Sequence, residues 1–205
     1  MMQDDGLAPR AWQRMLSGRR LDLLNPLPKD IEIEDIAHGL ARVARWNGQT
    51  VGDHAYSVAE HSLFVTDILL RLVPDAPKQW QMAALLHDAP EYVIGDLISP
   101  FKAAIGMDYK LFEGRLLDAI HQRFLISDVV SCELTAFIKE ADSIAAYFEA
   151  VQLAGFSQSE AEQYFPSPSK GDKRFEGFEV HLVASSVKQA QQDFLNRFEL
   201  LMDEV

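Results

Sequence analysis

The sequence has few of the features that mark secreted or membrane proteins. It contains a single cysteine, Cys132, so no internal disulfide can form, and a reducing cytoplasm is the expected location. No basic and apolar leader opens the chain. The longest apolar runs, such as Met82 to Leu86, are far too short to span a bilayer. We therefore expect a cytoplasmic protein that contacts no membrane.

Positive charge is also scarce. The chain has 19 Lys and Arg against 31 Asp and Glu, a formal net charge of −12. Binding to nucleic acid over a broad surface needs a basic face, and none is visible, so we expect no nucleic-acid partner. A small phosphate-bearing substrate is still compatible with this charge, because salt screens most of the field beyond roughly 8 Å. A divalent cation and one or two local basic side chains then decide binding at contact distance.

Strand-like alternation and internal repeats are absent, and apolar residues recur at helical spacing instead. The sequence therefore predicts an all-α fold. Its 205 residues suit a single domain, 1–205, with an N-terminal arm at 1–30 and a loop and C-terminal helix at 166–205. Residues 1–20 are interpreted as an arm or short helix. Helices are predicted at 31–43, 58–73, 78–93, 109–124, 128–154 and 183–202, and loops at 45–53 and 165–177.

Pro90 interrupts the very apolar helix predicted at 78–93. Proline removes the backbone bond to the Leu86 carbonyl and disfavours helical geometry at Ala89. This helix should kink or end between His87 and Glu91. The break would leave backbone free at a place where a site can form.

Four residues that can bind a metal lie in apolar surroundings. His61 lies on the helix at 58–73, His87 and Asp88 end an apolar run, and Asp142 precedes Ile144-Ala145-Ala146. Burying an ionised carboxylate is costly unless something pairs with it, and a shared divalent cation would satisfy all four groups. Each residue alone has an ordinary explanation, as a hydrogen-bonded histidine or an exposed acid. Their order along three helices favours a metal site.

These motifs resemble the HD-domain metal-dependent phosphohydrolases, whose signature is His, then His-Asp, then a distant Asp. The chain is especially similar to the bacterial 5′-deoxynucleotidases of that superfamily, over roughly residues 36–155. The matching segments are Arg45-Trp46, Glu60-His61-Ser62-Leu63, His87-Asp88-Ala89-Pro90-Glu91, Gly95-Asp96-Leu97-Ile98-Ser99-Pro100-Phe101-Lys102 and Ile138-Lys139-Glu140-Ala141-Asp142. The resemblance implies an HD-domain helical bundle, a homodimer, and hydrolysis of deoxyribonucleoside 5′-monophosphates.

The expected cofactor is one divalent metal ion held by His61, His87, Asp88 and Asp142. Two imidazoles and two carboxylates form a mixed nitrogen and oxygen set, which suits Mn, Co, Fe, Ni or Mg better than a closed thiolate zinc site. Such an ion acidifies water and neutralises charge on a phosphoryl group. Glu91 follows His87 by four residues, so it can share its helix face and act as the general base. The alternative for Glu91 is a solvent-facing glutamate.

Four further residues are candidates for contact with the nucleotide. Arg45 can clamp the phosphate, because a guanidinium offers paired donors. Trp46 can pack against the sugar and leave no room for a 2′-hydroxyl, or it can be an ordinary core aromatic. The resemblance assigns Asp96 to a sugar hydroxyl and Lys102 to phosphate, although either can be an ordinary surface charge.

Two other functions remain open. A deoxynucleoside triphosphate triphosphohydrolase would use the same metal site, but it needs extra basic groups for the β- and γ-phosphates, and few lie near the motifs. A non-catalytic HD fold that only binds nucleotides would be indicated by loss of a metal ligand or the general base, and all five positions are present.

Overall fold

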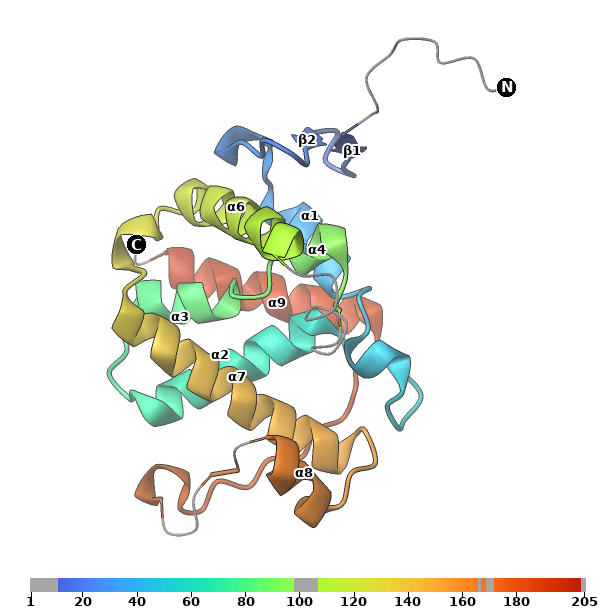
Figure 1. Ribbon diagram of the computed structural model, residues 1–205, viewed down its shortest axis with the longest axis vertical. Coiled ribbons are helices and arrows are strands. Elements are labelled where there is room, and N and C mark those ends of the chain that lie inside the picture. Colours follow the sequence, from blue (N-terminus) through green and yellow to red (C-terminus); the bar gives the residue numbers. More distant parts are fainter. Residues whose placement is uncertain (1–10, 98–106, 166, 169–171, 204–205) are drawn as a thin grey trace.

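The computed structural model describes residues 11–97, 107–165, 167–168 and 172–203. Within these ranges the chain is mainly helical, and the predicted all-α fold is confirmed (Figure 1). None of the described helices combines the length and apolar character needed to cross a bilayer. The helices are α1 (Ile33–Leu40), α2 (Val58–Leu72), α3 (Lys78–Leu85), α4 (Glu91–Ile94), α6 (Met107–Arg123), α7 (Cys132–Gln152), α8 (Gln158–Tyr164) and α9 (Val187–Met202), with short 3-10 turns η1 (Pro28–Asp30), η2 (Arg45–Gly48), η3 (Ser127–Val129) and η4 (Lys173–Phe175).

Helix α2 lies at the centre of the bundle and packs against α7, α3 and α9 (Figure 1). Its apolar stripe, which includes Val65, Ile68 and Leu69, is fully buried. The helix begins after Ser57, whose side chain accepts the backbone N–H of Glu60, while the Glu60 carboxylate accepts the backbone N–H of Ser57. This reciprocal cap satisfies amide groups that the first helical turn leaves without partners.

The predicted break in the helix at 78–93 is confirmed. Helix α3 ends at Leu85, a turn spans 86–90, and α4 begins at Glu91 with Pro90 as its N-cap. Proline is tolerated there because its missing N–H would have no intrahelical partner. His87 and Asp88 therefore lie partly buried in the turn between two helices, and Glu91 starts the second one.

The prediction for the N-terminal arm was wrong in one respect. Residues 12–14 and 20–22 form a short antiparallel hairpin, β1 (Trp12–Arg14) and β2 (Arg20–Asp22), in place of the short helix that was the alternative to an arm. Strands of three residues are too short to display a period of two in the sequence. The buried Leu21 attaches the hairpin to the core.

Two helices begin later than predicted because serine residues cap them. Helix α7 begins at Cys132 after Ser131, and α9 begins at Val187 after Ser186. In both, the serine side chain accepts a backbone N–H of the first turn. Ser, Thr, Asp and Asn are strongly preferred at this position. The predicted helix at 128–154 also loses its first residues to η3, which is a separate turn.

Gly39 of α1 supports the position of α4. A Cβ atom at Gly39 would lie 2.7 Å from Tyr92 Cβ and 2.9 Å from the Tyr92 carbonyl oxygen. Glycine is therefore needed for the close approach of α1 to α4, although alanine is otherwise the better helix former. Tyr92 directly follows Glu91, so this contact also sets the position of Glu91.

We expect Gly39→Ala to lower the free energy of unfolding by ~1–3 kcal/mol, the usual cost of overpacking a core. Gly114→Ala is the matched control, because Gly114 lies inside α6 and a Cβ there meets nothing within 4 Å. The control should raise stability by up to ~1 kcal/mol. Both variants would be compared with the wild type by urea denaturation. Equal effects at the two positions would contradict the packing argument.

Candidate metal centre and substrate site

Three of the predicted metal ligands meet in the core. The Nε2 atom of His61, on α2, lies 3.5 Å from Asp88 Oδ2, and the Nε2 atom of His87 lies 3.3 Å from the same oxygen. Within the described residues, one ligand atom from each of these residues lies within 4.8 Å of the other two. His87 Nδ1 lies 2.8 Å from the Ala84 carbonyl oxygen and donates to it, which leaves Nε2 for the site.

This group fits a divalent cation. The Nε2 atoms of His61 and His87 are buried, and neither makes a hydrogen bond among the described residues. Buried polar atoms without partners are rare and call for an explanation such as an ion. Two ligands at right angles, each about 2.1 Å from one cation, lie about 3 Å apart. The spacings of 3.3 and 3.5 Å to Asp88 are close to this value.

The fourth predicted ligand, Asp142, lies on α7. Its Oδ1 atom lies 3.1 Å from His61 Nε2, and its side chain is 40% exposed. Asp142 therefore lies next to His61, although it is outside the group of three residues whose ligand atoms are all within 4.8 Å of one another. Its exposure indicates that the candidate centre is open to solvent on the α7 side.

The charges around His61 raise its pKa and so determine its protonation. Burial and the nearby Arg45 act to lower the pKa of His61, but Glu149 and Asp142 outweigh them and raise it to about 10. In the metal-free protein the ring therefore carries a proton on Nε2 at neutral pH. A metal ion binds in place of that proton, since only the deprotonated nitrogen is a ligand. Binding of the cation should consequently release a proton.

Glu91 lies beside this centre, at the start of α4. Its side chain is buried, with 1% of the residue exposed, so the alternative of a solvent-facing glutamate is excluded. The backbone N–H of Glu91 donates to the Asp88 carbonyl oxygen at 3.0 Å. The turn that holds Asp88 thus also holds Glu91. A buried carboxylate three residues after Asp88 can act as a general base in a reaction at a cation held there.

Arg45, in η2, extends into the same region. Its Nη1 atom lies 3.8 Å from Asp88 Oδ2 and 3.9 Å from Asp96 Oδ2, and Nη2 lies 3.2 Å from Glu149 Oε2. Burial opposes the charge of Arg45, but these carboxylates raise its pKa further above the ordinary arginine value. Arg45 is therefore a permanent cation next to the candidate metal ligands. The Asp96 side chain is only 10% exposed, so Asp96 is not an ordinary surface charge.

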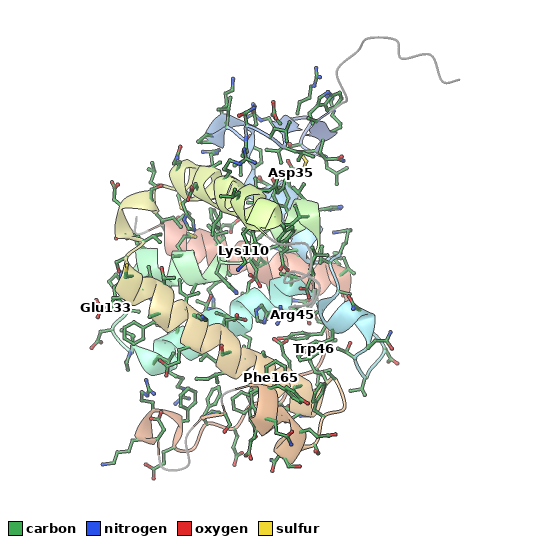
Figure 2. All side chains as sticks on the ribbon, in the orientation of Figure 1. Asp35, Arg45, Trp46, Lys110, Glu133 and Phe165 are labelled. Atoms are coloured by element: carbon green, nitrogen blue, oxygen red, sulfur yellow. The ribbon has the colours of Figure 1, made fainter. Side chains whose placement is uncertain are left out.

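Trp46 follows Arg45 and lies against the lower end of α7, beside Phe165 (Figure 2). Its ring centroid is 5.8 Å from that of Phe156 and 5.7 Å from that of Phe165. The indole N–H donates to Glu149 Oε2 at 2.9 Å. Trp46 therefore belongs to a small aromatic cluster, and it is also bonded to the region that holds Arg45. Lys102, the remaining predicted contact, lies outside the described residues.

Sequence reasoning missed Glu149. This residue of α7 is completely buried, and its carboxylate bonds to His61, Arg45 and Trp46. Burial acts to raise the pKa of Glu149, but the charges of Arg45 and His61 hold it below the ordinary glutamate value. One signal was available, because Glu149 follows Asp142 by two helical turns and so lies on the same face of α7.

A helical bundle with a His, His-Asp and Asp group defines the class of HD-domain proteins. A family model described as "5'-deoxynucleotidase YfbR-like" matches residues 35–167. The chain therefore belongs to the YfbR-like family of HD-domain 5′-deoxynucleotidases. The match includes most of α1, the candidate metal ligands, η2, α7 and α8.

Three relatives illustrate the range of similarity. An uncharacterised protein of Rhodobacter capsulatus is 60% identical over 159 residues, which are 78% of this chain and 81% of that protein. An uncharacterised protein of Escherichia coli, YfdR, is 31% identical over 56% of this chain and 57% of its own length. A 5′-deoxynucleotidase of Vibrio cholerae is 26% identical over 88% of this chain and 90% of its own length.

Proposed function

We propose that this protein is a metal-dependent phosphohydrolase that removes the 5′-phosphate from deoxyribonucleoside 5′-monophosphates. The observation that carries the proposal is the pair of buried Nε2 atoms of His61 and His87, which make no hydrogen bond within the described residues and lie beside Asp88. Family membership supports the reaction class. The Vibrio cholerae relative, named a 5′-deoxynucleotidase, supports the substrate.

In the proposed mechanism His61, His87, Asp88 and Asp142 hold one divalent ion. When bound, such an ion supplies positive charge that stabilises the phosphoryl oxygens and makes nearby water more acidic. Mixed nitrogen and oxygen ligands suit Mn, Co, Fe, Ni or Mg. The open side at Asp142 gives the phosphate a route to the site.

The general base in this proposal is Glu91. Its carboxylate takes a proton from the attacking water while that water adds to phosphorus and the ester bond to the sugar 5′-oxygen breaks; the leaving 5′-oxygen takes up a proton and becomes the hydroxyl of the deoxynucleoside. The buried position of Glu91 limits competition from bulk water for its oxygens. Arg45 binds the phosphate oxygens, because a charged guanidinium offers paired N–H donors.

Sugar recognition is assigned to Asp96 and Trp46. Asp96 accepts a hydrogen bond from a sugar hydroxyl, and Lys102 adds positive charge for the phosphate. Trp46 closes the space that a 2′-hydroxyl would need. Its contacts with Phe156 and Phe165 fix the plane of the indole ring, which steric exclusion of a single hydroxyl requires.

The test of the substrate is phosphate release from a panel of nucleotides. Deoxy- and ribonucleoside monophosphates and deoxynucleoside triphosphates would each be incubated with Mn, Co, Fe, Ni or Mg. We expect inorganic phosphate from the deoxy monophosphates. Release of triphosphate from the triphosphates alone would contradict the proposed substrate, and no turnover with any nucleotide and metal would favour a non-catalytic binding module.

The role of Trp46 predicts a change in sugar selectivity. Trp46→Ala should lower the ratio of kcat/KM for a deoxynucleoside monophosphate over its ribonucleotide by about tenfold, within the range that small steric differences give. Trp46→Phe is the matched control, because it keeps an aromatic ring against Phe156 and Phe165 while it loses the N–H and the second ring of the indole. The control should retain most of the selectivity. An unchanged ratio in Trp46→Ala would make Trp46 a packing residue.

A further inference from the structure

The two oxygens of Glu149 have different partners. Oε1 lies 2.6 Å from His61 Nδ1. Oε2 accepts the indole N–H of Trp46 at 2.9 Å and two guanidinium N–H groups of Arg45 at 3.2 and 3.3 Å. These partners come from two separate segments, α2 and η2, while Glu149 lies on α7. The buried carboxylate of Glu149 thus links α7 to α2 and η2 by hydrogen bonds.

The Oε1 contact determines which nitrogen of His61 carries the hydrogen and which one keeps the lone pair for the site. An ionised carboxylate only accepts hydrogen bonds, so Nδ1 must carry the hydrogen. The lone pair of the neutral ring is then on Nε2, the atom that lies 3.5 Å from Asp88 and 3.1 Å from Asp142. A carboxylate bonded to the far nitrogen of a histidine ligand commonly fixes its tautomer and orientation.

The Oε2 contacts hold a strained segment in place. Trp46 and its neighbour Asn47 have φ angles of 56° and 52°, in the left-handed region that residues with a side chain rarely occupy. Such backbone persists where surrounding contacts determine it. Here the side chains of Arg45 and Trp46 both bind the same oxygen of Glu149. Three N–H groups therefore fix the orientation of the carboxylate from one side.

We propose that Glu149 is a positioning residue: Arg45 and Trp46 orient its carboxylate, which in turn holds the Nδ1 hydrogen of His61 and presents Nε2 to the metal ion. This inference rests on the metal site of the proposed function. It goes beyond that function by making metal affinity depend on a residue that does not touch the ion. A purely structural ion pair between Glu149 and Arg45 would stabilise the fold but would leave the choice of His61 tautomer unaffected.

Glu149→Gln separates these two roles. Glutamine has one acceptor oxygen and one NH₂ donor. The oxygen should turn toward the three N–H groups of Arg45 and Trp46, which leaves the NH₂ group facing His61 Nδ1. His61 must then accept at Nδ1 and carry its hydrogen on Nε2, where it blocks the ligand atom. We expect the affinity for Co²⁺, titrated without any nucleotide, to fall by ~10–100-fold, the usual effect of losing such a partner.

The matched control is Glu60→Gln. Glu60 directly precedes His61 on α2, but its carboxylate bonds to Ser57 and Ser185 and to no predicted site residue. This variant should bind Co²⁺ with wild-type affinity. Glu149→Asp, which keeps an acceptor-only group, should bind more tightly than Glu149→Gln. Wild-type affinity in Glu149→Gln would overturn the inference while leaving the proposed function intact.

A measurement on the wild-type protein covers the case in which Glu149→Gln does not fold. Nitrogen-15 NMR of the metal-loaded protein, with diamagnetic Mg²⁺ or Zn²⁺, distinguishes a ring with its hydrogen on Nδ1 from one with its hydrogen on Nε2. The His61 signal is identified by its loss in His61→Gln. Hydrogen on Nδ1 supports the proposal, and hydrogen on Nε2 overturns it. Failure of the wild type to bind any divalent ion would contradict the proposed metal site itself, a result distinct from the others.

Discussion

Asp88→Ala should lose its bound metal and nearly all activity. Asp88 Oδ2 lies within 3.5 Å of both histidine Nε2 atoms, so its removal takes away the carboxylate that they share. Two neutral imidazoles and a single carboxylate, that of Asp142, would be left to balance a divalent charge. We expect the affinity for metal to fall by more than ~100-fold, beyond the effect typical of residues that only support a ligand. Metal content and turnover would be measured on the same preparation.

Asp67→Ala provides the control for that experiment. Asp67 is also an aspartate and lies on the central helix α2. Its side chain is half exposed and pairs with Arg197, which is not a predicted site residue. This variant should keep its metal and its activity. A full equivalent of metal together with normal turnover in Asp88→Ala would show that the proposed centre is wrong.

Glu91→Gln should keep its metal and lose the chemical step. The side chain is buried, so glutamine preserves its volume and avoids the cavity that alanine would leave. Loss of a positioned general base lowers rates by ~10²–10⁴. The variant should still bind substrate, because Arg45 and the metal ligands are unchanged. Single-turnover rates and metal content would be recorded together.

Glu133→Gln, an exposed change near the start of α7, is the control for Glu91→Gln. Its rate should match the wild type. If Glu91→Gln turned over at a near-normal rate with its metal in place, Glu91 would not be the base. Loss of metal along with activity would instead assign Glu91 to holding the centre.

The sequence predicted the parts of the site that depend on local chemistry. Proline at position 90 was enough to predict a break in the helix, and the structure has that break between α3 and α4. Apolar neighbours were enough to indicate that His61 is buried, and its exposed fraction is 0%. Periodicity and chemical type are both local properties, so they can be read without knowing how the helices pack.

Features that depend on tertiary contact were not predictable in the same way. Glu149 is separated from His61 by 88 residues, and no local sequence pattern around either residue predicts that the two are in contact. The surroundings of Trp46 likewise combine η2 with residues that follow α7. The roles of the site residues, the homodimer and the cytoplasmic location remain predictions.

The separation of these residues along the chain also bears on how the protein is made. His61, His87 and Asp88 leave the ribosome well before Asp142 and Glu149, which lie on a helix that must first emerge and dock onto α2. Until then the Nδ1 atom of His61 lacks the carboxylate that orients it. A nascent chain would have part of the proposed ligand set but not its geometry, so metal capture at the proposed site would belong to a late stage of folding.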